Sequence, residues 1–582
     1  TFDLSFGHTQ RPWLVPLSAT EASPFGPSSQ GWRISEVQDA KAKANAETSN
    51  GEADETVICH VAADGFEERM VPFPVPSGSY RDLAVVKDGV VWIEVADRGG
   101  ELGATRAGVT GEAPSDVLWH YNLSARHLDK LCERVDTFSV SGDGERLVVR
   151  HRDDTIVVPS SHKVDDDDPA YIRVDLTRLR RTVNPRAEWR QMFDENGRLM
   201  ASHYWREDMN GVDWDSVLNR YRPLVDLCHV VDDLHDILWE TVAELNTSHS
   251  YVSASGAAGD SDMRAGLLGA DVSSGNDGAK VVRVIPGESS DPRAWSPLRA
   301  AGVAVTEGDV IVAVDGRKVG ADGNLGELLE GSAGRVVELT VRRGENERQV
   351  AVVPMADEAP LRYHDWVASR RRYVEEHSGG RLGYLHVPDM VSDGWAELHR
   401  QIGEATRHEG VIADVRFNHG GHTSQLVVER LARRVVGWDY SRWYATADTY
   451  PQNAVRGPIV MVTNQWAGSD GDIVAAATQA MGYAKVIGER SWGGVVGIDG
   501  RFDLVDGTSV TQPRYAGWYG SYGWGVENHG VDPDIVVTVS PEDWEADCDV
   551  QLDAAIAECL RQLDDKPAAT APELPGPAFD RC

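Results

Sequence analysis

The chain has 582 residues, and its 57 basic and 92 acidic side chains give a formal net charge of −35 at pH 7. This acidic excess repels phosphate backbones and anionic lipid surfaces, which argues against nucleic acid as a partner. The length exceeds a single hydrophobic core, which stops growing at roughly 250–300 residues, and no apolar run approaches the ~20 residues of a membrane span. We therefore expect several domains and no membrane span.

The first predicted region, residues 1–178, is a partial β-propeller. Short apolar runs at Leu83–Val86, Val90–Ile93 and Leu147–Arg150 are separated by Gly, Asp and Ser turns, as in the blades of a propeller. Within this region, the polar stretch Glu36–Glu55 is interpreted as a solvated insertion. An acidic run, Asp165–Asp168, precedes the change to helical periodicity.

Residues 179–252 are predicted to form a helical domain. One helix face is defined by apolar residues at helical spacing, namely Leu234, Ile237, Leu238, Val242 and Leu245. This helix should stop at Asn246–Thr247. Ser248 and His249 then follow in the turn beyond it, where side chains can point into a cleft.

Residues 253–356 have the order of strands and turns of a PDZ module. The loop Gly266–Gly269 offers small residues and amides where such modules hold the C-terminal carboxylate of a peptide. The alternative is a spacer between domains that binds no peptide.

Residues 357–582 alternate strands and helices and are predicted to form an α/β catalytic domain with a C-terminal tail. The apolar strand Gly457–Thr463 leads into a loop, and Ser469 stands where the next helix begins. The amide of Asp470 at that helix N-terminus can stabilise an oxyanion, so Ser469 is a candidate nucleophile. The alternative is that Ser469 is a helix N-cap only, with Asp472 in support.

A second oxyanion donor is expected from the glycine turn that follows another predicted strand, Gly410–Asn418. Gly421 is the preferred donor, with Gly420 close behind, and a structural turn without catalytic duty is the alternative. His249 is the candidate base, and His419 and His422 beside the glycines are its rivals. The sequence has no H-E-x-x-H and no His/Cys cluster with ligand spacing, so no metal and no cofactor is expected.

Six segments, in the same order, resemble the tricorn proteases from about Asp175 to the end of the chain. These segments are Ala187–Met200, Gly211–Leu224, Glu244–Val252, Asp414–Gly421, Asn464–Asp472 and Gly523–Ile535. The resemblance implies a multidomain chain with a propeller portion, a helical bundle, a PDZ module and a crotonase-like α/β domain of the carboxyl-terminal-protease type.

The resemblance also implies a tetrad. Ser469 attacks, His249 takes its proton, Ser248 orients the imidazole, and Glu527 polarises Ser248. It further implies an oxyanion hole from the amides of Asp470 and Gly421. A substrate-binding acid at or near Asp439 would favour basic residues before the cut.

The expected substrates are short peptides left by larger proteases, and the expected assembly is a homo-oligomer, a hexamer by resemblance. Six cysteines without a C-x-x-C pair favour a reducing compartment, so we expect a cytoplasmic protein. Tricorn proteins carry two propellers, and residues 1–178 leave room for part of one. The missing blades are expected from a preceding or separate polypeptide.

Two other functions remain open on the sequence. A carboxyl-terminal processing protease shares the PDZ and α/β parts but uses a Ser/Lys dyad, and here Gly494 stands where the lysine would be. An inactive peptide-binding scaffold is the alternative from a different class.

Overall fold

The structure is a computed structural model that describes residues 10–17, 25, 61–63, 69–96, 115–151, 154–255, 263–291, 293–320, 323–443, 446–499 and 502–574. The chain divides into two compact units, Thr1–Arg181 and Thr182–Cys582. The proposed insertion Glu36–Glu55 lies outside the described residues. Among the described helices, none combines the length and the apolar character needed to span a bilayer.

The first unit is built from antiparallel sheets. One four-stranded sheet has the order β3-β4-β5-β6 and the other the order β10-β9-β8-β7. Their bounds are Tyr80–Val86, Gly89–Glu94, Val117–Asn122 and His127–Glu133 for β3 to β6, and Thr137–Val140, Arg146–His151, Asp154–Pro159 and Ile172–Val174 for β7 to β10; the short strands Trp13–Leu14 (β1) and Val71–Pro72 (β2) also pair. The three runs predicted as strands all lie in these sheets. The propeller assignment stays a prediction.

The helical part begins later after the acidic run than the sequence pattern suggested. Strand β10 and a short 3-10 turn (Leu176–Arg178) come between them. Its helices are α3 (Pro185–His203), α4 (Trp214–Val225) and α5 (Val231–Ala243), and they bury Phe193, Leu234 and Leu238 against one another. Helix α5 ends close to the predicted stop. Ser248 and His249 follow it in a turn.

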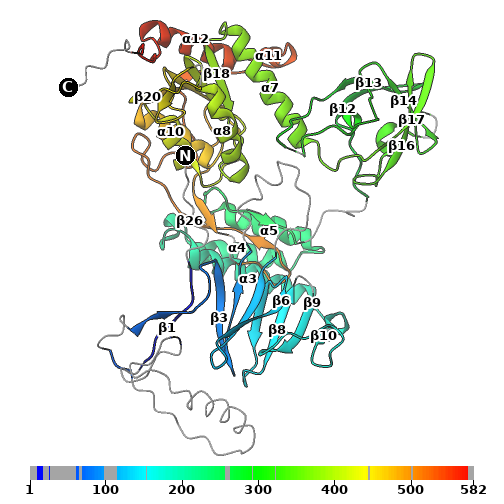
Figure 1. Ribbon diagram of the computed structural model, residues 1–582, viewed down its shortest axis with the longest axis vertical. Helices are drawn as coiled ribbons and strands as arrows, with labels where there is room; N and C mark the ends of the chain where they lie inside the picture. The colour runs from blue at the N-terminus through cyan, green and yellow to red at the C-terminus, as the bar shows by residue number, and fades with distance from the viewer. Residues whose placement is uncertain are drawn as a thin grey trace, which may run out of the picture. The chain divides into compact units, whose positions relative to one another are not determined.

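A long excursion from the α/β part packs onto these helices. Strand β25 (Ser509–Val510) pairs antiparallel with β11 (Val252–Ser253), and Leu504 and Val510 join the same buried cluster as Phe193. Strand β26 (Gln512–Tyr515) runs beside α3 and pairs with β24 (Gly497–Asp499) (Figure 1). Two segments far apart in sequence thus form one support for the residues after His249.

The PDZ-like part is a β-sheet module with its own core. Its sheet has the order β12-β13-β14-β16-β17, with β15 paired to β14. The bounds are Ala270–Gly275 (β12), Gly278–Val284 (β13), Val310–Val314 (β14), Arg317–Lys318 (β15), Leu325–Leu328 (α6), Val337–Arg343 (β16) and Asn346–Val352 (β17), with a 3-10 turn at Pro297–Arg299. The fold agrees with the PDZ prediction.

Three of the four amides of the predicted carboxylate-binding loop are already used inside the chain. Gly266 N–H donates to the Leu329 carbonyl at 2.8 Å, and Leu267 N–H donates to the Met355 carbonyl at 2.8 Å. Gly269 N–H donates to the Glu358 carboxylate at 2.6 Å. A carboxylate of the chain itself therefore occupies one of the donors that a peptide C-terminus would need, which favours the spacer interpretation.

The α/β part is organised around a five-stranded parallel sheet in the order β18-β19-β22-β23-β27. The strands are Leu382–His386, Gly410–Asp414, Ile459–Thr463, Ala484–Gly488 and Ile535–Val536, and a hairpin of β20 (Gly437–Asp439) and β21 (Asp448–Tyr450) lies outside the sheet. The helices are α7 (Ala359–His377), α8 (Ser392–Ala405), α9 (Ser424–Leu431), α10 (Asp470–Met481), α11 (Pro541–Glu545) and α12 (Val550–Asp565).

Helices cover both faces of this sheet, since alternate side chains of each buried strand point to opposite sides. Met461 and Val486 pack with α8, α9 and α10 on one face. Val460 and Ile487 pack with α7 and α12 on the other. The loops after β19, β22 and β23 leave the same carboxyl edge of the sheet, where ligands of such folds gather.

Candidate active site

Ser469 stands at the carboxyl edge of the sheet in a conformation that L-residues rarely adopt. It precedes α10 with φ 57° and ψ −119°, and its side chain makes no capping hydrogen bond. The loop before it is fixed because Gly468 N–H donates to the Asn418 carbonyl at 3.0 Å. The simple N-cap alternative therefore lacks its hydrogen bond. A held, sparsely populated backbone conformation at a partly exposed hydroxyl is typical of functional sites.

His249, Ser248 and Glu527 form a chain of hydrogen bonds. Ser248 Oγ donates to Glu527 Oε2 at 3.0 Å and lies 3.0 Å from His249 Nδ1. A hydroxyl has one proton, so the imidazole Nδ1 must be the donor to Ser248 while Ser248 donates to the carboxylate. This arrangement sets the tautomer and leaves the Nε2 lone pair of His249 available to accept a proton.

Glu527 is held by backbone donors from two distant segments. Its Oε1 accepts from Ser248 N–H at 2.6 Å, and its Oε2 accepts from Val495 N–H at 2.8 Å and from Val496 N–H at 3.1 Å. The negative end of the chain is thereby fixed next to Ser248.

Burial lowers the pKa of His249 below its ordinary value, and the Glu527 charge and a backbone hydrogen bond at Val496 partly oppose this shift. The imidazole is therefore neutral near pH 7. Its backbone has φ 59°, and its carbonyl accepts from the Thr511 hydroxyl. Tyr251 N–H donates to Thr511 Oγ1 at 2.7 Å, so the excursion residue Thr511 holds both sides of the turn.

Trp492 lies between the imidazole and the serine loop. Its ring contacts His249 edge-on, with centroids 5.5 Å apart, and a Cβ on Gly468 would come within 2.6 Å of the indole. Trp492 N–H also donates to the Ala467 carbonyl at 3.0 Å. Among the described residues no hydrogen bond joins His249 to the Ser469 hydroxyl. Such bonds are often long without substrate and tighten only in the complex.

The glycine turn lies directly against Ser469. A Cβ on Gly420, whose φ is 75°, would come within 2.5 Å of Ser469 Cβ, so only glycine fits. Gly421 is exposed beside it, with φ 148°. Asp470 turns its carboxylate to Ser424 N–H at 3.0 Å, and its own amide is at the first helical position of α10. Asp470 thus follows Ser469 directly in the chain, and Gly421 follows the glycine that packs against Ser469.

Three family models match successive parts of this chain. Residues 185–243 match the tricorn protease C1 domain, residues 266–357 the tricorn protease PDZ domain, and residues 381–537 peptidase family S41. The chain is 52% identical over 579 residues to tricorn protease homolog 1 of Streptomyces coelicolor, covering 99% of this chain and 53% of that protein.

The chain belongs to the tricorn protease family. It is 34% identical over 571 residues to a putative tricorn-like protease C-terminal subunit of Sulfurisphaera tokodaii, covering 97% of this chain and 62% of that one. It matches a crystal structure of the tricorn protease with a TM-score of 0.81 and 31% identity, over 95% of this chain and 51% of that chain. The chain thus spans about half to three-fifths of the length of these relatives.

Asp439, the substrate-binding acid that the tricorn resemblance implied, is not brought to Ser469. It is an exposed residue of β20, whose Trp438 lines a cavity with Thr406 and Arg407 beyond the end of α8. That is the edge where the parallel strands begin, whereas Ser469 follows the end of β22. Within one chain the two residues lie at opposite edges of the sheet.

The alternative bases of this tricorn-family chain are placed differently from His249. His419 and His422 are exposed on the glycine turn, and their backbone N–H groups donate to the carbonyls of Pro388 and Met390. Gly494, at the position of the processing-protease lysine, offers only a backbone N–H, which donates to Asp472 at 3.3 Å. Within the described ranges, no group of three or more His, Cys, Asp or Glu side chains could hold a metal ion.

Asp472 is a residue that the sequence indicated only as support for a helix cap. It is fully buried on α10 and accepts from Gly493 N–H at 2.8 Å and from the Ser491 hydroxyl. Burial raises its pKa to about 6. Through these bonds Asp472 anchors the segment that carries Trp492 and the two amides bound to Glu527. Its only signal in the sequence was an acidic residue in the first turn of a helix.

Proposed function

We propose that this chain is a serine peptidase that cleaves short peptides through an acyl-enzyme on Ser469. The observation that carries the proposal is the hydrogen-bonded chain Glu527–Ser248–His249, in which Ser248 and Glu527 are 279 residues apart in sequence. It is built against the loop of a serine with a strained backbone. The peptidase family S41 match over residues 381–537 supports the same class of reaction.

In the proposed reaction, Ser469 Oγ attacks the carbonyl carbon of the peptide bond as its proton passes to His249 Nε2. The amides of Asp470 and Gly421 stabilise the oxyanion. Collapse breaks the C–N bond, and Nε2 gives the proton to the leaving amine. Water then attacks the ester, with His249 again as base, and releases the acid and free Ser469. Glu527 stabilises the imidazolium through Ser248 without itself taking the proton.

The substrates proposed for the whole protein are oligopeptides produced by larger proteases, in a cytoplasmic homo-oligomer, taken here as a hexamer. Within one chain, Asp439 lies at the opposite edge of the sheet from Ser469. If Asp439 is the acid that selects basic residues, a neighbouring copy of the chain must therefore supply it. The inactive scaffold is the competing function, favoured by no contact in the site.

The test is hydrolysis of fluorogenic peptides by the chain and by Ser469→Ala. We expect the variant to lose about 10⁴-fold or more in kcat/KM, the usual cost of removing a nucleophile. Ser392→Ala, on the exposed start of α8, is the matched control and should retain activity. Equal turnover by Ser469→Ala and the unchanged chain would reject the peptidase proposal.

A further inference from the structure

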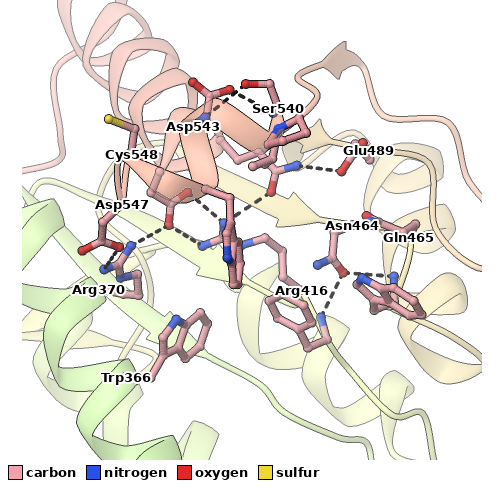
Figure 2. A pocket seen from close by; sticks show the side chains of 17 residues that line it. Trp366, Arg370, Arg416, Asn464, Gln465, Glu489, Ser540, Asp543, Asp547 and Cys548 are labelled. Carbon is pink, nitrogen blue, oxygen red and sulfur yellow. Dashed lines mark hydrogen bonds and ion pairs between the residues drawn. The ribbon is translucent and has the colours of Figure 1, made fainter. Parts of the chain in front are cut away.

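A cavity of about 690 Å³ opens at the carboxyl edge of the parallel sheet, beside the loop that carries Ser469 (Figure 2). Its walls come from α7, from the loops after β19, β22 and β23, and from the segment around α11. None of the tetrad residues lines it. The proposed reaction therefore leaves this cavity without a role.

Aromatic side chains form much of the wall. Trp366 meets Phe417 edge-on with centroids 6.2 Å apart, and Trp466 and Trp544 are 64% and 79% exposed. Large apolar side chains gathered around one hollow are costly to leave in water and mark a binding surface. Aromatic walls of this kind bind a flat or large apolar group, with edge and face contacts to the rings.

The base of the cavity holds an unused hydrogen-bond donor. Asn464 is only 4% exposed, and its Oδ1 accepts from Phe417 N–H at 3.0 Å and Trp466 N–H at 3.2 Å. Its Nδ2 has no hydrogen bond to any described residue, and Figure 2 shows that nitrogen turned toward the middle of the cavity. An amide donor that faces the cavity and not a protein acceptor can donate to a carbonyl of a ligand.

Charge limits what can bind. The buried guanidinium of Arg416 is neutralised by Asp414 and Asp549, each at 2.8 Å, and Arg370 pairs with Asp549 at 3.1 Å. The remaining charged residues of the wall are the carboxylates of Glu489, Asp543 and Asp547. Phosphate and carboxylate ligands are therefore disfavoured, and a neutral or basic ligand is favoured.

We propose that this cavity is a peptide subsite that takes an aromatic or large apolar side chain, with Asn464 Nδ2 donating to a carbonyl of the same peptide. The naming of the ligand as a peptide rests on the proposed function. The subsite shares its wall with the catalytic loop, because Asn464 and Trp466 precede Ser469 and Phe417 precedes the glycine turn. It would thus select residues near the cut without touching the reacting atoms.

The test uses the full chain and N-acetyl-tryptophanamide, which combines one aromatic side chain with two neutral peptide groups, followed by ligand-observed NMR titration. Trp544→Ala should weaken binding about tenfold or more, the scale of a lost aromatic anchor. Trp443→Ala removes an equally exposed tryptophan, 76% exposed, that does not line the cavity, and should leave the affinity unchanged. N-acetyl-alaninamide and the anionic N-acetyl-tryptophan should bind at least about tenfold more weakly.

Unchanged affinity in Trp544→Ala, or no binding of the amide to the unaltered chain, would overturn the subsite. A change of oligomeric size in Trp544→Ala with unchanged affinity would also overturn it, since the patch would then be a subunit contact. A parallel hydrolysis assay distinguishes failure of the subsite proposal from failure of the peptidase proposal. If the chain binds the amide through Trp544 but hydrolyses no peptide, the subsite proposal stands and the peptidase proposal is rejected. If the chain hydrolyses peptides but does not bind the amide through Trp544, only the subsite proposal is rejected.

Discussion

Ser469 and His249 both have a positive φ, 57° and 59°, but different kinds of neighbours hold them there. Ser469 is fixed within one α/β layer, by Asn418 and the glycine turn at the same sheet edge. His249 is fixed by Glu527 and Thr511, more than 250 residues away in sequence. The nucleophile therefore depends on a local turn, whereas the base depends on long-range pairing between two parts of the chain.

The largest expected effect is the loss of the base, His249, which distant residues hold in place. His249→Ala should lower kcat/KM for fluorogenic peptides by about 10⁴-fold, because the proposed base for the serine proton is then missing. His419→Ala changes an exposed histidine on the neighbouring glycine turn and should retain nearly full activity. A large loss in His419→Ala with a small one in His249→Ala would reverse the assignment of the base.

A smaller effect is expected at the far end of the hydrogen-bonded chain. Glu527→Gln keeps the shape but removes the charge and presents N–H groups to donors, so kcat should fall by about 10²–10⁴-fold with a smaller change in KM. Glu545→Gln on the exposed helix α11 is the control. If the two variants have the same activity, Glu527 does not orient the base.

Asp472 should matter less, because it acts only by positioning. Asp472→Asn weakens the anchor of the Ser491–Gly494 segment, and a displacement of about 1 Å there should cost up to about 10²-fold in kcat/KM. Asp448→Asn on the exposed strand β21 serves as the control. Unchanged kcat/KM in Asp472→Asn would show that the segment holds its position without this carboxylate.

The smallest expected effect is a shift on the pH axis. Activity needs neutral His249, so kcat/KM should rise with pH through a pKa below 6.5 and be level by pH 7. The Glu527 charge raises that pKa, so in Glu527→Gln the acid limb of the residual activity should move to lower pH. A movement to higher pH would contradict the electrostatic role given to Glu527.

The sequence was sufficient where the signal is local. A buried strand, a loop and a helix start predicted where Ser469 stands, and the apolar face of α5 predicted the turn with Ser248 and His249. The anchoring role of Asp472 was not predicted, because its partners, Ser491 and Gly493, are loop residues without a sequence pattern of their own. The site roles came from resemblance, since no periodicity links residue 248 to residue 527.

Long-range packing was beyond sequence patterns for the same reason. The excursion through β25 reads as part of the α/β domain, yet it pairs with β11 and is buried against the helical part. Asp439 likewise follows a helix in the order expected for the catalytic domain, but its hairpin leaves from the edge where the strands begin. Which edge a hairpin leaves from depends on the topology of the sheet.

Covalent labelling by a serine-directed phosphonate, with the modified residue located by mass spectrometry, tests the partnership of the two segments most directly. The account predicts that the unaltered chain is labelled at Ser469 and that His249→Ala slows this labelling by several orders of magnitude, with the fold intact by circular dichroism. Equal labelling rates in the two proteins, or modification at another serine, would contradict it.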